Sequence, residues 1–157
     1  MSEIKTIEGK DSVGNARIAI VASRYNSHIV ERLLKGCIDV LKKSGITEGD
    51  ITVVRVPGAF EIPMAAGRLA DTENYDAIIA LGAVVRGETP HFEYISSGCA
   101  NGLATIALQV EIPVIFGVLT VDNIDQAEDR SGDEESNKGS EAARTAIEMI
   151  DVLRKIS

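Results

Sequence analysis

Cysteine and histidine are scarce in this sequence, which restricts the kinds of site it can build. The 157 residues include only two cysteines, Cys37 and Cys99, and two histidines, His28 and His91. Both cysteines lie in segments with helical periodicity, and neither has a partner at the spacing of metal ligands, so we expect reduced thiols in the core. The histidines lie far apart and lack a neighbouring cluster of cysteines or carboxylates. We therefore predict no disulfide and no metal site.

The sequence also lacks a long apolar run and an excess of basic residues. No stretch is long enough to span a membrane, and the polar N-terminus has no apolar signal-peptide segment. Sixteen basic and 24 acidic residues give a formal net charge of −8 at pH 7, whereas binding to phosphate backbones or anionic lipids requires clustered cations. We therefore expect a cytoplasmic protein that binds neither nucleic acid nor membranes.

Several nucleotide-binding and hydrolase signatures are missing. No GxGxxG, GxSxG or HExxH motif occurs. The segment Gly82–Thr89 approximates the phosphate-binding pattern GxxxxGK[ST], but Glu88 replaces the lysine, and the first half has the composition of a strand rather than a loop. Without the lysine the segment lacks the cation that contacts the phosphates, so it does not predict a site for a nucleoside triphosphate.

Four apolar segments rich in β-branched residues are separated by segments with helical periodicity. Three of the four are nearly continuous hydrophobic runs, which is typical of parallel strands buried on both faces. Because strands and helices alternate without a linker or repeat, we predict a single α/β domain, residues 1–157: a three-layer α/β/α sandwich around a four-stranded parallel, flavodoxin-like sheet. The expected strands are Arg17–Ala22, Ile51–Val56, Ala77–Val85 and Pro113–Leu119, and the expected helices run near Ile29–Leu41 (with Gly45 at its end), Met64–Leu69, Phe92–Leu108, Ile124–Arg130 and Glu141–Ile156.

Unusual residues follow the predicted strands, at the place where open parallel sheets bind their ligands. Ser23–Asn26 follows the first strand, Val56–Glu61 ends the second, and Arg86–His91 follows the third. Aromatic residues make up only 4% of the chain, yet four of them occur near these strand ends or within the fourth strand. This distribution favours a flat heterocycle as the ligand. The four residues are Tyr25, Phe60, Phe92 and Phe116.

Each of these residues also has a purely structural interpretation. His91 follows a Gly-Glu-Thr-Pro turn and opens a helix, whose N-terminus disfavours the imidazolium; this suits a proton acceptor, but a surface histidine explains the position equally well. Tyr25 and Phe116 are, as single residues, more often packing residues than ligand contacts. Glu61 is as often an ordinary first-turn acid as a ligand for hydroxyls. Arg130 is by default a solvated charge.

Taken together, these segments resemble the lumazine synthase family. The matching motifs run in order from about residue 14 to the end of the chain with family-like spacing. Each motif alone is weak, but seven in register are specific. They are Arg24-Tyr25-Asn26, Val56–Pro63, Leu81–Gly87, Thr89 with His91–Tyr94, Phe116–Thr120, Asp125–Ala127 with Arg130, and Asn137-Lys138-Gly139.

The resemblance implies a reaction and a role for each matching residue. The reaction is the penultimate step of riboflavin biosynthesis: 5-amino-6-(D-ribitylamino)uracil condenses with 3,4-dihydroxy-2-butanone 4-phosphate to 6,7-dimethyl-8-ribityllumazine, releasing phosphate and water without a metal or organic cofactor. By this resemblance His91 transfers protons. The pyrimidine and its ribityl chain are bound by Tyr25, Asn26, Ala59, Phe60, Glu61, Ala83, Val84, Val85 and Phe116, and the phosphate-bearing substrate is bound by Glu88, Thr89, Arg130 and Lys138.

The resemblance also implies a homopentamer with shared active sites, which assembles into a closed shell of about 60 subunits, with riboflavin synthase as a candidate partner. In each shared site, two groups of residues would meet across a subunit boundary: Phe116, Arg130 and Lys138 from one chain, and Tyr25, Phe60 and His91 from the other. Within the N-terminal extension, residues 1–13, Glu3–Glu8 is a candidate strand without a partner in its own chain, so we expect it to pair with a neighbouring subunit. The acidic run Asp133–Glu135 would repel its copies and make the shell depend on salt. The small residues Ser97, Gly98, Gly102 and Thr105 allow close packing of the third helix, either within the subunit or near a five-fold axis.

Three alternatives compete with this interpretation. One is a paralogous riboflavin synthase that dismutates two lumazine molecules, and another is a non-catalytic flavin- or lumazine-binding protein. The third is a purely structural shell protein. Arg130 and the turn Gly87–His91 favour a phosphate-bearing substrate and argue against the first alternative, and the presence of both His91 and Arg130 argues against the second.

Overall fold

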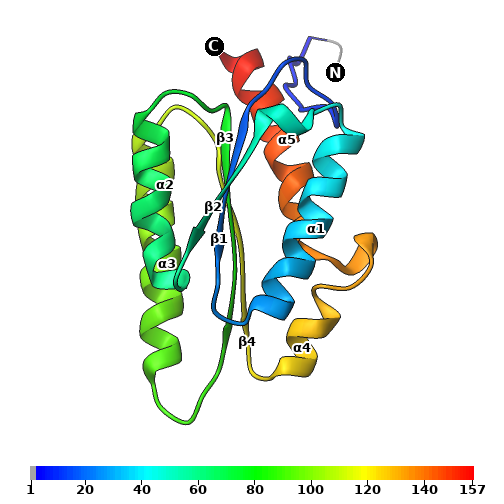
Figure 1. Cartoon of the computed structure of the whole chain (residues 1–157). Coiled ribbons are helices and arrows are strands. Elements are labelled where there is room, and N and C mark those ends of the chain that lie inside the picture. The colour runs from blue at the N-terminus through cyan, green and yellow to red at the C-terminus, as the bar shows by residue number, and fades with distance from the viewer. Residues whose placement is uncertain (1–2) are drawn as a thin grey trace.

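The computed structural model describes residues 3–157 and has a parallel sheet at its centre (Figure 1). The strands lie in the order β2-β1-β3-β4, and every neighbouring pair is parallel. This is the order of a flavodoxin-like sheet. All four strands predicted from the apolar runs are confirmed, with bounds that differ by at most two residues. They are β1 (Ile18–Ser23), β2 (Ile51–Val56), β3 (Ala77–Val85) and β4 (Val114–Val121).

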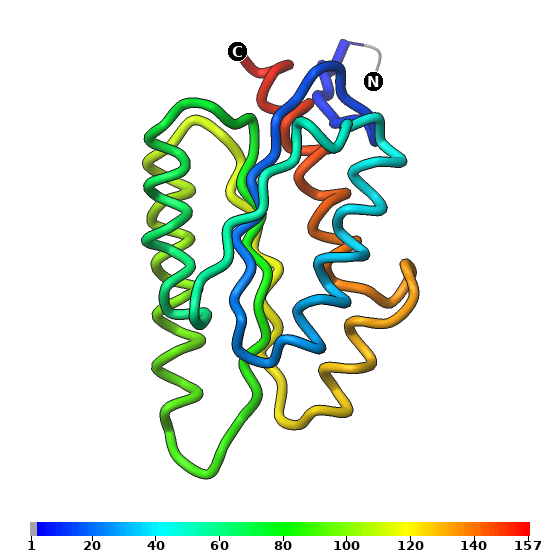
Figure 2. The backbone as a smooth tube through the Cα atoms, in the orientation of Figure 1, coloured from blue at the N-terminus to red at the C-terminus, as the bar shows by residue number. Residues whose placement is uncertain are grey.

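Helices cover both faces of the sheet, which confirms the three-layer α/β/α sandwich. Helices α1 and α5 pack together on one face, and α2 and α3 cover the other (Figure 1 and Figure 2). Within residues 3–157, no helix is long and apolar enough to cross a membrane. The helices are α1 (Ser27–Lys43), α2 (Ile62–Asp71), α3 (His91–Gln109), α4 (Ile124–Asp129) and α5 (Lys138–Ile156), with single 3-10 turns at Glu48–Asp50, Ala59–Glu61 and Glu134–Ser136.

Successive side chains of the central strand β1 point alternately to the two faces of the sheet and belong to two separate parts of the core. All six residues of β1 are buried. Ile18, Ile20 and Ala22 belong to the cluster under α1 and α5, whereas Ala19 and Val21 belong to the cluster under α2 and α3. Because successive side chains of a strand point to opposite faces, a strand between two helical layers has to be apolar at every position. Truncation of one of these side chains, such as Ile20→Ala, is expected to cost about 2–5 kcal/mol.

Individual residues explain where α1 ends and where α5 begins. Gly45 has a φ of 98° just beyond α1, the left-handed conformation that glycine adopts after a helix. Helix α5 begins at Lys138, earlier than the expected start at Glu141. The reason is Asn137, whose side chain accepts hydrogen bonds from two main-chain N–H groups of the first turn and so caps the helix.

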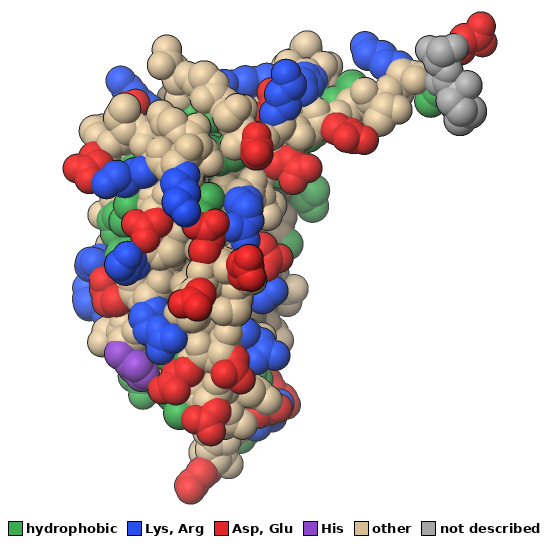
Figure 3. All heavy atoms as spheres, turned by 90° about the vertical axis from the view of Figure 1, so that its right-hand side faces the viewer, with side chains coloured by type: hydrophobic (Ala, Val, Ile, Leu, Met, Phe, Trp, Pro, Cys, Tyr) green, Lys and Arg blue, Asp and Glu red, His purple; other side chains and the backbone are tan. Residues whose placement is uncertain are grey.

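Residues 8–10 of the N-terminal extension lie against α5. The Nζ of Lys155 donates to the main-chain carbonyl of Glu8 over 2.7 Å, and the N–H of Lys10 donates to the carboxylate of Asp151 over 2.8 Å. Residues 3–7, before this contact, project from the body of the molecule (Figure 3). Among the described residues, Glu3–Glu8 forms no strand within its own chain, and its pairing with a neighbouring subunit stays a prediction.

Candidate active site

An open pocket of about 580 Å³ lies at the carboxyl ends of β1, β2 and β3. The chain passes from β1 outward to β2 and then back past β1 to β3, so the strand order reverses between β1 and β3. Doubly wound sheets bind their ligands at this place. The C-terminus lies at the opposite end of the molecule (Figure 1). The pocket is lined by Tyr25, Asn26, Pro57, Gly58, Ala59, Phe60, Glu61, Ala83, Val84, Val85, Gly87, Thr89, His91, Phe92 and Ile95.

Hydrogen bonds connect the turn after β1 to the ends of both neighbouring strands, β2 and β3. The N–H of Tyr25 donates to the carbonyl of Pro57 over 3.1 Å, and Asn26 Nδ2 donates to the carbonyl of Ala83 over 2.9 Å. Asn26 has a φ of 60°, a left-handed conformation that asparagine tolerates better than most residues. These contacts hold the first pocket-lining turn in a single arrangement.

The turn after β2 closes around the carboxylate of Glu61. The N–H of Gly58 donates to Glu61 Oε1 over 3.0 Å. A Cβ at position 58 would lie 3.3 Å from the same oxygen, so glycine permits this close approach. The hydrogen bond orients the carboxylate at the edge of the pocket. Since a carboxylate has about four acceptor sites, Glu61 can also accept hydrogen bonds from the hydroxyls of a ligand.

Two aromatic rings at the pocket are unusually exposed. Tyr25 is 75% exposed and Phe60 is 56% exposed, so both present an apolar ring face to solvent. The ring of Phe60 rests on α3, where a Cβ at Gly98 would lie 2.7 Å from Phe60 Cε1, and a Cβ at Gly102 would lie 2.8 Å from the ring of Pro63. The two glycines of the small-residue stripe therefore serve packing within the chain. The exposed ring faces suit stacking against a flat ligand.

His91 is the first residue of α3 and lines the pocket, which confirms its predicted position at a helix N-terminus. Two residues of the preceding loop, Gly87 and Thr89, also line the pocket, whereas Glu88 is exposed and is not among the lining residues. A helix N-terminus attracts anions through its unpaired main-chain N–H groups. This end of the pocket therefore combines an imidazole with main-chain N–H groups that suit a negatively charged group.

Arg86, a residue without a predicted role, stabilises the loop between β3 and α3. Its Nε donates to Asp122 Oδ1 over 2.9 Å, and its guanidinium lies over the ring of Phe92, 4.8 Å from the ring centroid. A guanidinium over an aromatic face is a favourable contact. Arg86 thus links the end of β3 to the segment after β4 and to the first turn of α3. No local sequence pattern indicates these partners.

The remaining predicted site residues line a second surface pocket, on the α5 side of the edge strand β4. This pocket has a volume of about 490 Å³, and its lining includes Phe116, Arg130 and Lys138. Arg130 and Lys138 are neighbours because the N–H of Lys138 donates to the carbonyl of Arg130 over 2.9 Å, next to an antiparallel bridge between Ser131 and Asn137. Within the chain, none of the three residues lines the pocket of His91. Apart from Glu88, which lines neither pocket, the predicted site residues therefore form two separate groups.

Both cysteines are free and buried, which confirms the expected core thiols. Burial raises the pKa of Cys37 to about 12 and that of Cys99 to about 11, because a thiolate loses its hydration in an apolar core. Neither thiol can serve as a nucleophile near neutral pH. In residues 3–157, no group of three or more His, Cys, Asp or Glu side chains is arranged to hold a metal ion.

The fold and the position of the pocket place this protein among the α/β proteins that hold a small ligand beyond the carboxyl ends of a parallel sheet. A comparison with known families narrows this class. The family model for 6,7-dimethyl-8-ribityllumazine synthase matches residues 15–154. The chain therefore belongs to the lumazine synthase family, as the sequence motifs indicated, and the family connects it with riboflavin biosynthesis. The match begins after the N-terminal extension.

Proposed function

We propose that this protein condenses 5-amino-6-(D-ribitylamino)uracil with 3,4-dihydroxy-2-butanone 4-phosphate to 6,7-dimethyl-8-ribityllumazine, with loss of phosphate and water. The observation that supports this most strongly is the composition of one pocket. The rings of Tyr25 and Phe60, the carboxylate of Glu61 and the imidazole of His91 surround the same cavity. Each of these groups suits a different part of the reaction.

The pyrimidine substrate is flat at one end and a polyol at the other. Its ring would stack on an exposed aromatic face, which is worth about 0.5–1.5 kcal/mol beyond the burial of apolar area. Main-chain groups at the end of β3, Ala83–Val85, would meet the polar edge of the ring. The ribityl chain would donate hydroxyl hydrogen bonds to Glu61, whose carboxylate is already oriented by Gly58.

The chemistry consists of bond changes that each need a proton transfer. The substrate amine attacks the ketone and loses water to form an imine; phosphate then leaves by elimination, and ring closure with loss of a second water gives the lumazine. His91 would give and take these protons, because an imidazole ring can both donate and accept a proton. Much of the remaining acceleration would come from holding two substrates together, since proximity replaces an encounter in solution.

The phosphate requires local cations, because the chain as a whole has a net charge of −8. Thr89 and Glu88 lie in the loop before α3, but the cations Arg130 and Lys138 line the separate pocket beside β4. We propose that the complete site lies between subunits, with the His91 pocket of one chain facing the β4 edge of the next. A closed ring satisfies every such contact, and the family resemblance favours a homopentamer.

On the same resemblance we propose that pentamers assemble into a closed shell of about 60 subunits, with riboflavin synthase as a candidate partner. The loop between Arg130 and Asn137 is short, whereas the resemblance associates a longer loop before the last helix with forms that stop at pentamers. Its acidic run is partly neutralised, since Glu134 Oε1 accepts a hydrogen bond from Lys43 over 2.6 Å and Oε2 lies 3.9 Å from Arg144. The hydrogen bond with Lys43 lowers the pKa of Glu134.

Incubation of the purified protein with both substrates tests the proposed reaction. We expect the absorbance of the lumazine product to appear together with an equal amount of phosphate, faster than in a reaction without protein, and a chelator should leave the rate unchanged. The controls contain each substrate alone. If lumazine alone yields riboflavin, the protein is the paralogous riboflavin synthase; if flavin binds tightly without turnover, it is a binding protein. Either result would exclude the proposal.

A further inference from the structure

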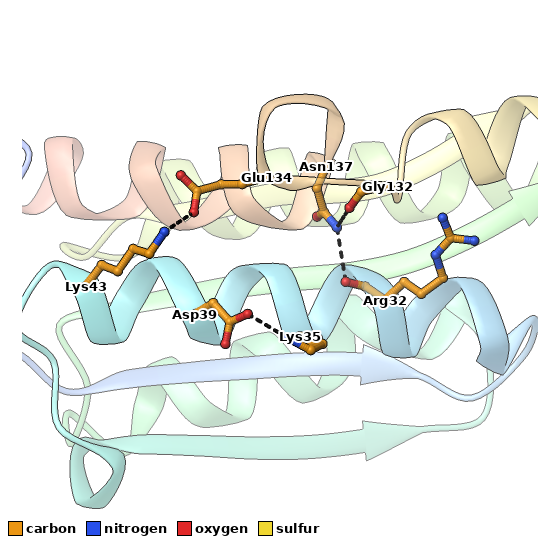
Figure 4. A network of polar contacts seen from close by, with 7 residues as sticks. All are labelled: Arg32, Lys35, Asp39, Lys43, Gly132, Glu134 and Asn137. Atoms are coloured by element: carbon orange, nitrogen blue, oxygen red, sulfur yellow. Dashed lines mark hydrogen bonds and ion pairs between the residues drawn. The ribbon is translucent and has the colours of Figure 1, made fainter.

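One residue of α1, Arg32, binds the loop on both sides of Arg130. Its Nε donates to the main-chain carbonyl of Ser131 over 2.9 Å, and its Nη2 donates to the carbonyl of Glu128 over 3.4 Å. Arg130 lies between these two carbonyls in the sequence. Figure 4 shows Arg32 on α1, with its side chain directed along the helix toward the segment that precedes this loop.

The other end of the loop is bound to the same turn of α1. Asn137 Nδ2 donates to the main-chain carbonyl of Arg32 over 3.1 Å and to the carbonyl of Gly132 over 3.0 Å, as the dashed lines in Figure 4 mark. Asn137 is almost completely buried, so these hydrogen bonds are shielded from water and costly to leave unmade. The backbone and side chain of Arg32 therefore hold both ends of the loop.

The two cations at the base of the loop are Arg130 and Lys138. The main chain joins them, because the N–H of Lys138 donates to the carbonyl of Arg130 over 2.9 Å. The side chain of Arg130 is oriented in turn by a hydrogen bond from its Nη1 to the carbonyl of Gln126 over 3.1 Å. A planar guanidinium such as that of Arg32 can reach two carbonyls at once, whereas a lysine ammonium acts as a single point charge on a flexible stem.

We propose that Arg32 is a positioning residue for the phosphate-bearing substrate: by binding the carbonyls of Glu128 and Ser131, it holds Arg130 and Lys138 at the spacing at which both contact one phosphate. The inference rests on the proposed function, in which these two cations bind the phosphate. Arg32 itself touches no substrate. Its effect is expected on phosphate recognition and not on binding of the pyrimidine.

The test compares Arg32→Ala and Arg32→Lys with the control Lys35→Ala. Lys35 is a basic residue one turn further along α1 that pairs with Asp39 over 2.9 Å and makes no hydrogen bond to the loop. For Arg32→Ala we expect the KM of the four-carbon substrate and the Kd of inorganic phosphate to rise about three- to tenfold, the effect of losing one or two hydrogen bonds. The KM of the pyrimidine should stay constant, and Arg32→Lys should be intermediate.

Two further measurements separate positioning from general charge or stability. In an Arg130→Ala background the Arg32→Ala change should have a smaller effect than in the wild type, because only Lys138 is left to be positioned and residues that act through one another are not additive. The amide of Lys138, which is bonded to Arg130 in the wild type, should exchange its hydrogen faster in Arg32→Ala. The proposal would be overturned if the effects of Arg32→Ala and Arg130→Ala were fully additive, or if the KM values of both substrates rose equally. It would also be overturned if Lys35→Ala caused an equal defect while Arg32→Lys restored full function.

A failure of the proposed role of Arg32 can be distinguished from a failure of the proposed reaction. If the wild type makes no lumazine, the proposed reaction fails, but the Kd of inorganic phosphate and the exchange of the Lys138 amide still decide the role of Arg32. Unchanged values of both in Arg32→Ala overturn it. A wild-type protein that neither makes lumazine nor binds phosphate overturns both proposals together.

Discussion

Gly98 of α3 lies directly behind the ring of Phe60, and a Cβ built on Gly98 would approach Phe60 Cε1 to 2.7 Å. No normal Cβ contact is this short, so the ring rests where it does because position 98 has no side chain. Phe60 lines the pocket and is 56% exposed, which means that its ring can move outward when it is pushed. A helix glycine therefore sets the position of a pocket ring.

The substitution Gly98→Ala is expected to change the pocket more than the fold. Alanine raises helix propensity by about 0.5–1 kcal/mol, and displacement of an exposed ring offsets part of this gain, so the free energy of unfolding should change by less than about 1 kcal/mol. The KM of the pyrimidine substrate should rise several-fold, because the stacking surface moves. Chemical unfolding and steady-state kinetics measure the two effects.

Gly67→Ala is the matched control for this prediction. Gly67 lies in the middle of α2, and a Cβ there would lie 3.6 Å from Ile106 Cδ1, an ordinary van der Waals distance. This variant should gain about 0.5–1 kcal/mol of stability from helix propensity and keep the wild-type KM. A Gly98→Ala enzyme with an unchanged KM would show that substrate binding does not use the observed position of Phe60.

Local patterns in the sequence were sufficient to predict the sheet and the location of His91. The apolar run Ala77–Val85 is flanked by segments with helical periodicity and therefore indicates a strand, since a parallel strand between two helical layers must be apolar on both faces. The strand ends then follow, and with them the expectation that His91 opens a helix beside the pocket. These features depend on residues that are close together in the sequence.

Features that depend on distant residues could not be predicted in this way. The bond from Asn26 to Ala83 spans 57 residues and that from Arg32 to Ser131 spans 99, and neither partner carries a local signal of the other. Asn26, which makes the first of these contacts, has a left-handed conformation. The separation of Phe116 from the His91 pocket was expected from the family resemblance alone, because the order of the motifs contains no information about which chain completes a site.

The buried thiols predict how stability depends on alkaline pH. The pKa of Cys37 is raised to about 12 and that of Cys99 to about 11, against 9.0 for an unperturbed thiol. The unfolded chain therefore releases these protons first. The thiols contribute their full stability below about pH 9 and lose it as the pH rises toward the folded values, by up to about 1.4 kcal/mol per pH unit for each thiol.

Chemical unfolding of the wild type and of Cys37→Ala at a series of pH values measures this contribution. Cys37→Ala should have a lower free energy of unfolding at neutral pH because of the cavity, but a shallower decline above about pH 9 because one titrating group is gone. Other groups titrate in both proteins and cancel in the comparison. Parallel curves for the two proteins would show that Cys37 ionises as readily in the folded state as in the unfolded state.

His91→Ala is expected to slow turnover more than it weakens binding. General acid–base catalysis by a positioned side chain is typically worth about 10²–10⁴-fold, and the uncatalysed condensation of two bound substrates sets a lower limit to the rate. The Kd of the pyrimidine should change little, because Tyr25, Phe60 and Glu61 remain in place. Single-turnover kinetics with both substrates bound isolates the chemical step. An unchanged rate of that step would remove His91 from the mechanism.

The separation of His91 from Arg130 allows a direct test of the shared site. His91→Ala damages the pocket at the strand ends, and Arg130→Ala damages the group beside β4. If a site combines the first group of one chain with the second group of its neighbour, co-expression of the two variants creates some sites with both residues intact. For random mixing in equal amounts, about a quarter of the sites are intact in a cyclic oligomer.

We therefore expect the co-expressed pair to recover about a quarter of the wild-type rate at low concentrations of the four-carbon substrate, whereas each variant alone stays far below this value. The matched control is the pair His91→Ala and Glu61→Ala. Both of these residues line the same pocket of one chain, so every site in the mixed oligomer lacks one of them and no activity should return. Recovery in the first pair and not in the second would identify which residues come from the same subunit. A mixed oligomer of the first pair without recovery would mean that Arg130 acts on the pocket of its own chain or does not act at all, and the site between subunits would have to be abandoned.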